Sequence, residues 1–205
     1  MNAPTTVIRE AVQALRRVVI EGVAPEVDAG RFPIKRTVGE QVQVRADIYA
    51  DGHDLLRAVL LYRREEEKGW AEQEMRPINN DRWGGEFATQ ALGRYVYTVA
   101  GWVDEWASWS AGLRKKVDAG QDVSVDVLVG VGLLHAAAGR ARGVDAKKLT
   151  DAAVKLKEVA ARDRAAAVKL TGDSELAALV NRNRNRDVDA RYEKELAVVV
   201  DPAKA

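Results

Sequence analysis

The spacing of the apolar residues changes twice along this chain of 205 residues, and this change limits the folds that the chain can adopt. Apolar and polar residues alternate over residues 41–49, as they do in a half-buried β-strand, and aromatic and β-branched residues alternate over residues 94–102. From about residue 120 to residue 188 the apolar residues recur every three or four positions, as on one face of a helix. Strand-like spacing returns after residue 190. The sequence therefore predicts a β-domain whose strands are interrupted by a block of helices.

The β part contains several short strands separated by turn residues. Residues 58–62 form a nearly continuous apolar run whose Val and Tyr content favours a strand, and shorter strands are expected from Gly69 to near Met75 and over residues 83–87. Glycine, asparagine and aspartate lie between these runs. This pattern is typical of two packed antiparallel sheets. We expect the fold class to be all-β plus α, with an immunoglobulin-like antiparallel β-sandwich formed by residues 17–119 and 189–205.

The helical part is expected to be an inserted bundle at residues 120–188, before the last strand of the sandwich. One apolar face contains Val127, Val131 and Leu134, and a second run begins at Leu149 and continues toward Leu170. A third short helix would be capped by Asp173 or Ser174. Narrow alanine-rich faces bury little surface by themselves, so these helices need a partner surface. Residues 1–16 are expected to form a tail or a short helix.

Composition excludes several classes of function. Lys and Arg total 32 against 31 Asp and Glu, so the net charge of +1 gives no reason to expect a nucleic-acid partner. The chain has no cysteine, and its 2 histidines show no metal-ligand spacing, so neither a metal nor a cofactor is expected. No apolar run is as long as a membrane span, and residues 1–6 do not resemble a secretory signal. We therefore expect a cytoplasmic protein with no membrane partner.

Tryptophans and acids gather where the strand at residues 94–102 is expected to end. Residues 104–109 read as a continuation of that strand, and neighbouring residues of a strand point to opposite faces. Asp104 and Glu105 therefore could not flank one sugar, as the paired carboxylates of a glycosidase must. Trp106 and Trp109 could stack on a sugar ring or pack in the core, and core packing is the better-supported alternative.

Three cations, Arg31, Lys35 and Arg36, surround a proline-stiffened loop. They could contact a phosphate, or they could be solvated residues linked to nearby acids. Together with Trp83 and Trp106 they are the candidate carbohydrate or phosphate contacts. We identify no candidate catalytic residue, since the chain has no glycine-rich phosphate loop and no nucleophile motif.

Four segments, taken in order, resemble a known family. They read RVVIEGVAPEVDAGRFPIKR at residues 17–36, DGHD at 51–54, DRW at 81–83, and LGRYVYT at 92–98, which runs on to WVDEW at 102–106. Together they are similar to the N-terminal region of the alpha-1,4-glucan:maltose-1-phosphate maltosyltransferases, amylase-type enzymes of glycoside hydrolase family 13. The resemblance covers nearly the whole chain from about residue 17.

The resemblance implies a β-sandwich N domain with a helical insertion, followed in the family by a (β/α)8 barrel and a C-terminal sandwich. The family's aspartate nucleophile and glutamate acid/base lie in the barrel, which would begin where this chain stops. The implied role is a non-catalytic accessory region that forms a homodimer through the helical insertion and the sandwich. Its partner would be the barrel of the same polypeptide, and maltose 1-phosphate and α-1,4-glucan would be the substrates of the whole enzyme. A stand-alone α-glucan-binding module is the alternative.

Overall fold

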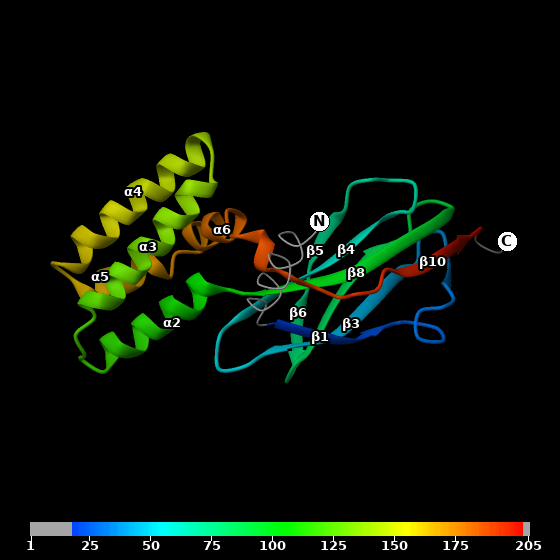
Figure 1. Cartoon of the computed structure of the whole chain (residues 1–205), viewed down its shortest axis with the longest axis horizontal. Helices are drawn as coiled ribbons and strands as arrows, with labels where there is room; N and C mark the ends of the chain where they lie inside the picture. The colour runs from blue at the N-terminus through cyan, green and yellow to red at the C-terminus, as the bar shows by residue number, and fades with distance from the viewer. Residues whose placement is uncertain (1–17, 203–205) are drawn as a thin grey trace, which may run out of the picture. The chain divides into compact units, whose positions relative to one another are not determined.

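The computed structural model describes residues 18–202, so the tail or short helix expected at residues 1–16 lies outside the described residues. The chain divides into two compact units (Figure 1). Among the described residues, the β unit holds residues 18–52, 56–103 and 188–202, and the helical unit holds residues 53–55 and 104–187. Strands and helices together make the chain α+β.

The β unit forms two sheets from strands of 2 to 11 residues. Its strands are β1 (Val18–Ala24), β2 (Ile34–Thr37), β3 (Gln41–Ala50), β4 (Leu56–Arg64), β5 (Ala71–Glu74), β6 (Arg76–Asn79), β7 (Arg82–Ala88), β8 (Gly93–Val103), β9 (Ala190–Arg191) and β10 (Leu196–Asp201). One sheet has the order β1-β3-β7-β6. The other has the order β2-β10-β8-β4-β5, with β9 also paired to β8.

The strand pairing is antiparallel except at one place. β10 pairs with β8 in the antiparallel direction but with β2 in the parallel direction, with Val198 opposite Ile34. The sequence predicts a wholly antiparallel arrangement and leaves residues 30–36 as a loop, and both expectations are wrong at β2. This strand has only 4 residues and two of them are cations, so its composition gives a weak strand signal.

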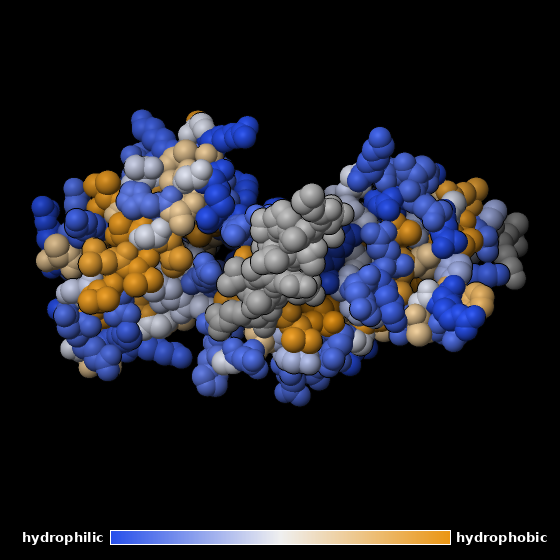
Figure 2. All heavy atoms as spheres, viewed as in Figure 1, coloured by the Kyte–Doolittle hydropathy of each residue, from blue (hydrophilic) through white to orange (hydrophobic). Residues whose placement is uncertain are grey.

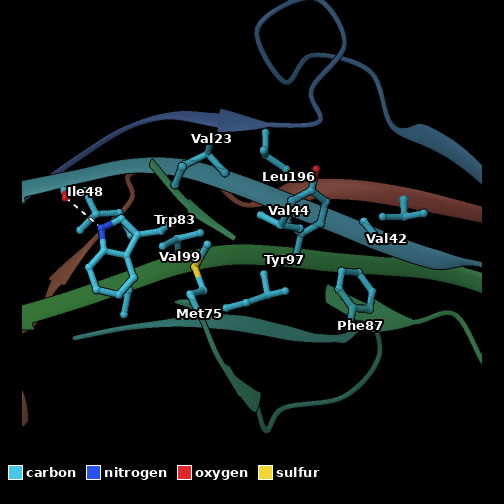
Figure 3. Packing of buried hydrophobic residues seen from close by; sticks show 14 of the residues in the cluster. Val23, Val42, Val44, Ile48, Met75, Trp83, Phe87, Tyr97, Val99 and Leu196 are labelled. Atoms are coloured by element: carbon cyan, nitrogen blue, oxygen red, sulfur yellow. Dashed lines mark hydrogen bonds between the residues drawn. The ribbon is translucent and has the colours of Figure 1, made fainter. Parts of the chain in front are cut away.

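The two sheets share one hydrophobic core (Figure 3). β3 shows the predicted alternation, with Val42, Val44 and Ile48 turned inward. β8 adds Tyr97 and Val99 from the facing sheet, and its side chains are buried from Tyr95 to Trp102. A strand that is buried on both faces shows little alternation of polarity, which matches the continuous apolar sequence of β8.

Tyr97 is the largest of the fully buried side chains, and its hydroxyl is not left without a partner. The hydroxyl donates a hydrogen bond to the backbone carbonyl of Pro25, in the segment that follows β1. Burial raises the pKa of the Tyr97 hydroxyl, and the positive charge of Arg36 opposes that rise in part. The neutral hydroxyl therefore anchors this segment to the core at physiological pH.

The helical unit is built from α-helices of 8 to 18 residues. They are α2 (Glu105–Asp118), α3 (Ser124–Arg140), α4 (Gly143–Ala160), α5 (Arg164–Thr171) and α6 (Ser174–Arg182), followed by a 3-10 turn at Arg186–Val188. An aspartate side chain caps α2, α5 and α6. The run expected to continue from Leu149 toward Leu170 is interrupted, because Asp163 accepts a hydrogen bond from the amide of Ala166 at 3.0 Å and starts α5. Of the two residues predicted to cap α6, Asp173 is the cap, and it accepts a hydrogen bond from the amide of Leu176 at 2.8 Å. Within the described residues, no helix has both the length and the apolar character of a membrane span.

The prediction that residues 104–109 continue the strand is wrong. Asp104 is the N-cap of α2, and its carboxylate accepts a hydrogen bond from the amide of Ala107 at 2.9 Å. The buried residues Trp106, Ser110 and Leu113 follow at spacings of four and three, which is a helical pattern. The tryptophans and the adjoining strand hid this pattern, since aromatic residues also favour strands.

Trp109 joins α2 to α3 over a glycine. The indole Nε1 of Trp109 donates to the carbonyl of Asp126 at 2.9 Å, and the ring lies against Gly130. A Cβ atom added to Gly130 would be 2.1 Å from Cζ2 of Trp109, far inside van der Waals contact. The absence of a side chain at Gly130 therefore allows the two helices to approach each other.

Replacing Tyr97 with Phe should lower the free energy of unfolding by about 1–2 kcal/mol, because the hydrogen bond to Pro25 is lost. The raised pKa means that folding favours the protonated hydroxyl. The contribution of Tyr97 is thus fully present below the unfolded tyrosine pKa of about 10 and is lost as the pH rises above it. Urea denaturation at pH 7 and above pH 10 should therefore show a gap between wild type and Y97F that narrows at the higher pH. An equal gap at both values would contradict this role.

Replacing Gly130 with Ala should destabilise the helical unit by about 1–3 kcal/mol, because Trp109 must leave its position against α3. Gly139 offers the matched control, since it lies in the same helix and a Cβ there would meet nothing within 4 Å. We expect G139A to be neutral or slightly stabilising. Thermal unfolding of both variants, followed by circular dichroism, measures the difference. Equal melting temperatures for the two variants would show that the Trp109 contact does not limit α3 packing.

Candidate functional site

The loop that carries Arg31 is a tight turn between β1 and β2. The amide of Gly30 donates to the carbonyl of Val27 at 3.1 Å, and Val27 and Phe32 form an isolated bridge across the turn. The exposed Arg31 guanidinium is 3.1 Å from the carboxylate of Asp28 and lies over the ring of Phe32. Both contacts are local and exposed, which fits the alternative of a solvated, ion-paired loop.

The other two cations of the predicted set lie in β2, where neighbouring side chains point to opposite faces of the sheet. Lys35 is exposed, while Arg36 is half-buried on the same side of the strand as the core residue Ile34. The guanidinium of Arg36 donates to the carbonyl of Lys35 at 2.7 Å. The strand therefore separates these cations and does not gather them around one anion.

Trp83 and Trp106 are both buried. The Trp83 ring belongs to the core of the β unit, and its Nε1 donates to the carbonyl of Ile48 at 3.1 Å (Figure 3). Trp106 is 3% exposed, packs against Trp109 with 4.9 Å between ring centroids, and belongs to the core of the helical unit. Core packing, the alternative already favoured for the tryptophan cluster, accounts for both rings. Carbohydrate or phosphate contact by Arg31, Lys35, Arg36, Trp83 and Trp106 stays a prediction.

Asp104 and Glu105, the two acids beside Trp106, were expected to point to opposite faces of a strand. They do not alternate along a strand, because both lie at the start of α2. Asp104 is 8% exposed and its carboxylate caps the helix, whereas Glu105 lies in the first turn and is exposed. A carboxylate near a helix N-terminus is stabilising, and this accounts for the pair without a catalytic role.

A cleft that the sequence did not reveal opens in the β unit between β5 and β7. We call it the β5–β7 cleft; its volume is about 450 Å³. Its lining combines aromatic residues with amides and charged residues: Gln41, Tyr62, Arg63, Arg64, Glu67, Ala71, Gln73, Glu86, Phe87, Ala88, Gln90 and Tyr95. Tyr62 stacks on Phe87 with 4.6 Å between the ring centroids and 15° between the planes.

This cleft could not be read from the sequence because its residues come from separate strands in two sheets. Tyr62 was expected in a strand at residues 58–62 and Phe87 in a strand at residues 83–87, and both expectations are confirmed. The stacked pair nevertheless depends on how the two sheets face each other, which strand periodicity does not specify.

The comparisons with known proteins agree with the sequence resemblance. A family model described as "Alpha-1,4-glucan:maltose-1-phosphate maltosyltransferase, domain N/S" matches residues 16–202. A protein of that name from Myxococcus xanthus (strain DK1622) is 42% identical over 201 residues, which cover 94% of this chain and 30% of the relative. Another of that name, from Chlorobaculum tepidum, is 44% identical over 190 residues, covering 93% of this chain and 28% of the relative.

The chain spans less than a third of the length of these two relatives. The match nevertheless extends over nearly all of the chain and falls in the part of the family described as domain N/S. The chain therefore belongs to the alpha-1,4-glucan:maltose-1-phosphate maltosyltransferase family and corresponds to its N-terminal region.

Proposed function

We propose that this chain is a non-catalytic accessory and dimerisation region of a maltosyltransferase that transfers maltose from maltose 1-phosphate to α-1,4-glucan. The relatives are named for this activity, and the rest of their length would supply the catalytic barrel. The proposal includes a cytoplasmic location and a homodimer formed through the helices and the sheets. One observation carries the dimer: the outer face of α3.

The outer face of α3 is apolar along most of its length. Between Asp126 and Arg140 this helix contains no charged residue. Val125, Leu128 and Val129 are 73%, 57% and 51% exposed, and the small residues Gly132 and Ala136 continue the same face. Figure 2 shows hydrophobic side chains gathered on the surface of the helices. We call the set Val125, Leu128, Val129, Gly132 and Ala136 the α3 stripe.

The neighbouring helix α4 shows what an ordinary solvated face looks like in this unit. Its exposed residues include Lys147, Lys148 and Lys155, and its two exposed large apolar residues, Val144 and Val154, lie ten positions apart. Scattered apolar residues of this kind are normal on protein surfaces, whereas a contiguous apolar stripe marks an interaction site. A helix of 17 residues is about 25 Å long, which gives a second copy of α3 room to pack against the stripe.

A second copy of the chain is the proposed occupant because the stripe has no charge to select a different partner. Two-fold symmetry brings the same patch of both subunits together, so an uncharged apolar patch is self-complementary. Small residues at Gly132 and Ala136 would allow close approach of the two helices. The family resemblance supports the same assignment.

We also propose that the β unit is an immunoglobulin-like sandwich into which the helices are inserted before its last strands. Support comes from the chain order, since α2 to α6 all lie between β8 and β9. The pairing of Ala190 with Gly101 also brings the two ends of the helical segment together beside β8. The inserted block would begin near Asp104 and not at residue 120, because α2 starts at Glu105.

A stand-alone α-glucan-binding module is the second candidate function. The observation that favours it is the β5–β7 cleft, in which a stacked aromatic pair lies among amide side chains. The two candidates differ in whether the chain acts by itself or as part of a larger enzyme, and a glucan-binding cleft would serve in either case.

Replacing Val129 with Glu should weaken the dimer at least about ten-fold in Kd, because a charge would be buried against a second apolar face. Sedimentation velocity at micromolar concentrations of the full chain measures the change. V154E is the matched control, because the side chain of Val154 is 52% exposed, about as much as that of Val129, and lies on the charged face of α4. This control should leave the Kd of the dimer unchanged. A monomeric wild type, or V129E and wild type with equal dissociation constants, would overturn the dimer proposal.

Removing residues 104–187 and joining Val103 to Val188 through a short Gly-Ser linker should leave the sheets folded. The paired residues Gly101 and Ala190 lie just inside the two cut ends, so a short linker can bridge them. Far-ultraviolet circular dichroism should then lose its helical bands and keep a cooperative β transition. Loss of the cooperative transition would show that the helices are required for folding of the sheets, contrary to an insertion.

A further inference from the structure

We propose that the β5–β7 cleft is a binding site for a neutral oligosaccharide chain. The chemical class follows from the cleft itself. The choice of α-1,4-linked glucose as the sugar rests on the proposed function.

Strand topology gathers the cleft residues at one end of the β unit. β3 begins at Gln41 opposite the end of β7 at Ala88, and β4 ends beside the beginning of β8, where Arg64 is opposite Tyr95. β5 begins at Ala71, opposite Tyr62. These strand ends come from both sheets, so the cleft has a wall on each side and the core beneath it.

The edge of β7 is open along the cleft. β6 pairs with β7 only at Arg82, Trp83 and Gly84, and from Gly85 onward β7 has no ladder partner on that side among the described residues. Unpaired backbone N–H and C=O groups of an edge strand can bond the hydroxyls of a ligand. The break in the β6–β7 ladder therefore adds polar backbone groups to the wall of the cleft.

The floor of the cleft is aromatic. Phe87 is 3% exposed and supports the half-buried ring of Tyr62, and Tyr95 lies beside Phe87 with 6.2 Å between the ring centroids. The hydroxyl of Tyr95 accepts a hydrogen bond from the amide of Ala91 at 3.1 Å, which fixes this ring. An aromatic ring held in one orientation costs little entropy on binding, and its face complements the apolar C–H face of a pyranose.

The rim of the cleft is rich in groups that bond hydroxyls. Gln41, Gln73 and Gln90 are exposed amides, and Glu86 is an exposed carboxylate. None of these four side chains has a hydrogen-bond or ion-pair partner within residues 18–202. Amides supply both donors and acceptors, and a carboxylate supplies two acceptors, which is the combination that sugar hydroxyls match.

The cations that line the cleft are already engaged, and this argues against a phosphate ligand. Arg63 donates to the carbonyls of Glu65 and Glu67 at 2.8 and 2.7 Å, contacts Glu195 at 3.4 Å, and lies over the ring of Trp70. Arg64 is 2.5 Å from the carboxylate of Glu66, while its buried Nε has no hydrogen-bond partner among the described residues. A phosphate would need cations that are free to neutralise it. The cleft instead offers an aromatic floor and uncharged amides.

The direct test is titration of the 15N-labelled full chain with maltohexaose at millimolar concentrations, followed by NMR. We expect saturable shifts of the backbone amides of Tyr62, Gln73 and Phe87. Inorganic phosphate at the same concentration should leave these signals in place. Shifts of these amides with phosphate and not with maltohexaose would overturn the assignment to a neutral ligand, and the absence of saturable cleft shifts with maltohexaose would overturn the site.

A paired set of variants tests the rim. Gln73→Ala combined with Gln90→Ala should raise the Kd for maltohexaose at least about ten-fold, while Gln121→Ala, an exposed glutamine in the helical unit, should leave it unchanged. Because the substituted side chains are exposed, the melting temperatures should match that of the wild type, and this is measured alongside. Equal Kd values for the double variant and the control would show that the rim does not bind the sugar.

The result of the maltohexaose titration can be distinguished from the result of the sedimentation test of the dimer. A chain that sediments as a dimer but shows no cleft shifts would overturn this inference and the glucan-binding candidate, and it would leave the dimer proposal standing. A monomer that binds maltohexaose at the cleft would overturn only the dimer proposal.

Discussion

The β unit depends on strand β8, and the aspartate that follows this strand begins the helical unit. β8 is flanked by β4 on one side and by β10 and β9 on the other, and its side chains are buried from Tyr95 to Trp102. Directly after the strand, the amide of Asp104 donates to the carbonyl of Leu55 at 2.8 Å, and its carboxylate caps α2. Neighbouring strands hold β8 in place up to Val103. The Asp104 cap then determines that α2 begins at the next residue. One buried side chain thus separates a sheet-forming sequence from a helix-forming one.

The two units leave different chemistry at their surfaces. The α3 stripe is apolar and uncharged, so it gains free energy by excluding water and selects a partner that is equally apolar. The β5–β7 cleft keeps its aromatic rings low and places amides around them, so a ligand must satisfy hydrogen bonds as well as cover a ring. The first suits a second protein surface and the second suits a polyhydroxylated chain. Under the two proposals, one chain would carry an apolar surface for assembly and a chemically different surface for ligand binding.

The sequence predicts the long, regular elements well and the junctions poorly. β3 and β8 follow from alternation and apolar content, and the α6 cap follows from Asp173. Helix α2 was missed because Trp106 and Trp109 favour strands as strongly as helices, and only the aspartate cap marks the change. β2 was missed because its pairing with β10 joins residues more than 160 positions apart, and no local pattern encodes such pairing. For the same reason the sequence placed Lys35 and Arg36 in a loop with Arg31, whereas both lie in β2. The cleft also depends on long-range pairing and was not predicted.

The position of β10 has a consequence for how the chain is made. β10 lies between β2 and β8 in its sheet, yet it is synthesised after all of the helices. The helices occupy residues 105–182 and can pack before β10 is made, whereas the edges of β2 and β8 that pair with β10 stay open until residues 196–201 leave the ribosome. During that interval the apolar strand β8 is a template for pairing with other nascent chains. Completion of this sheet therefore waits for a strand that is translated after the whole helical block.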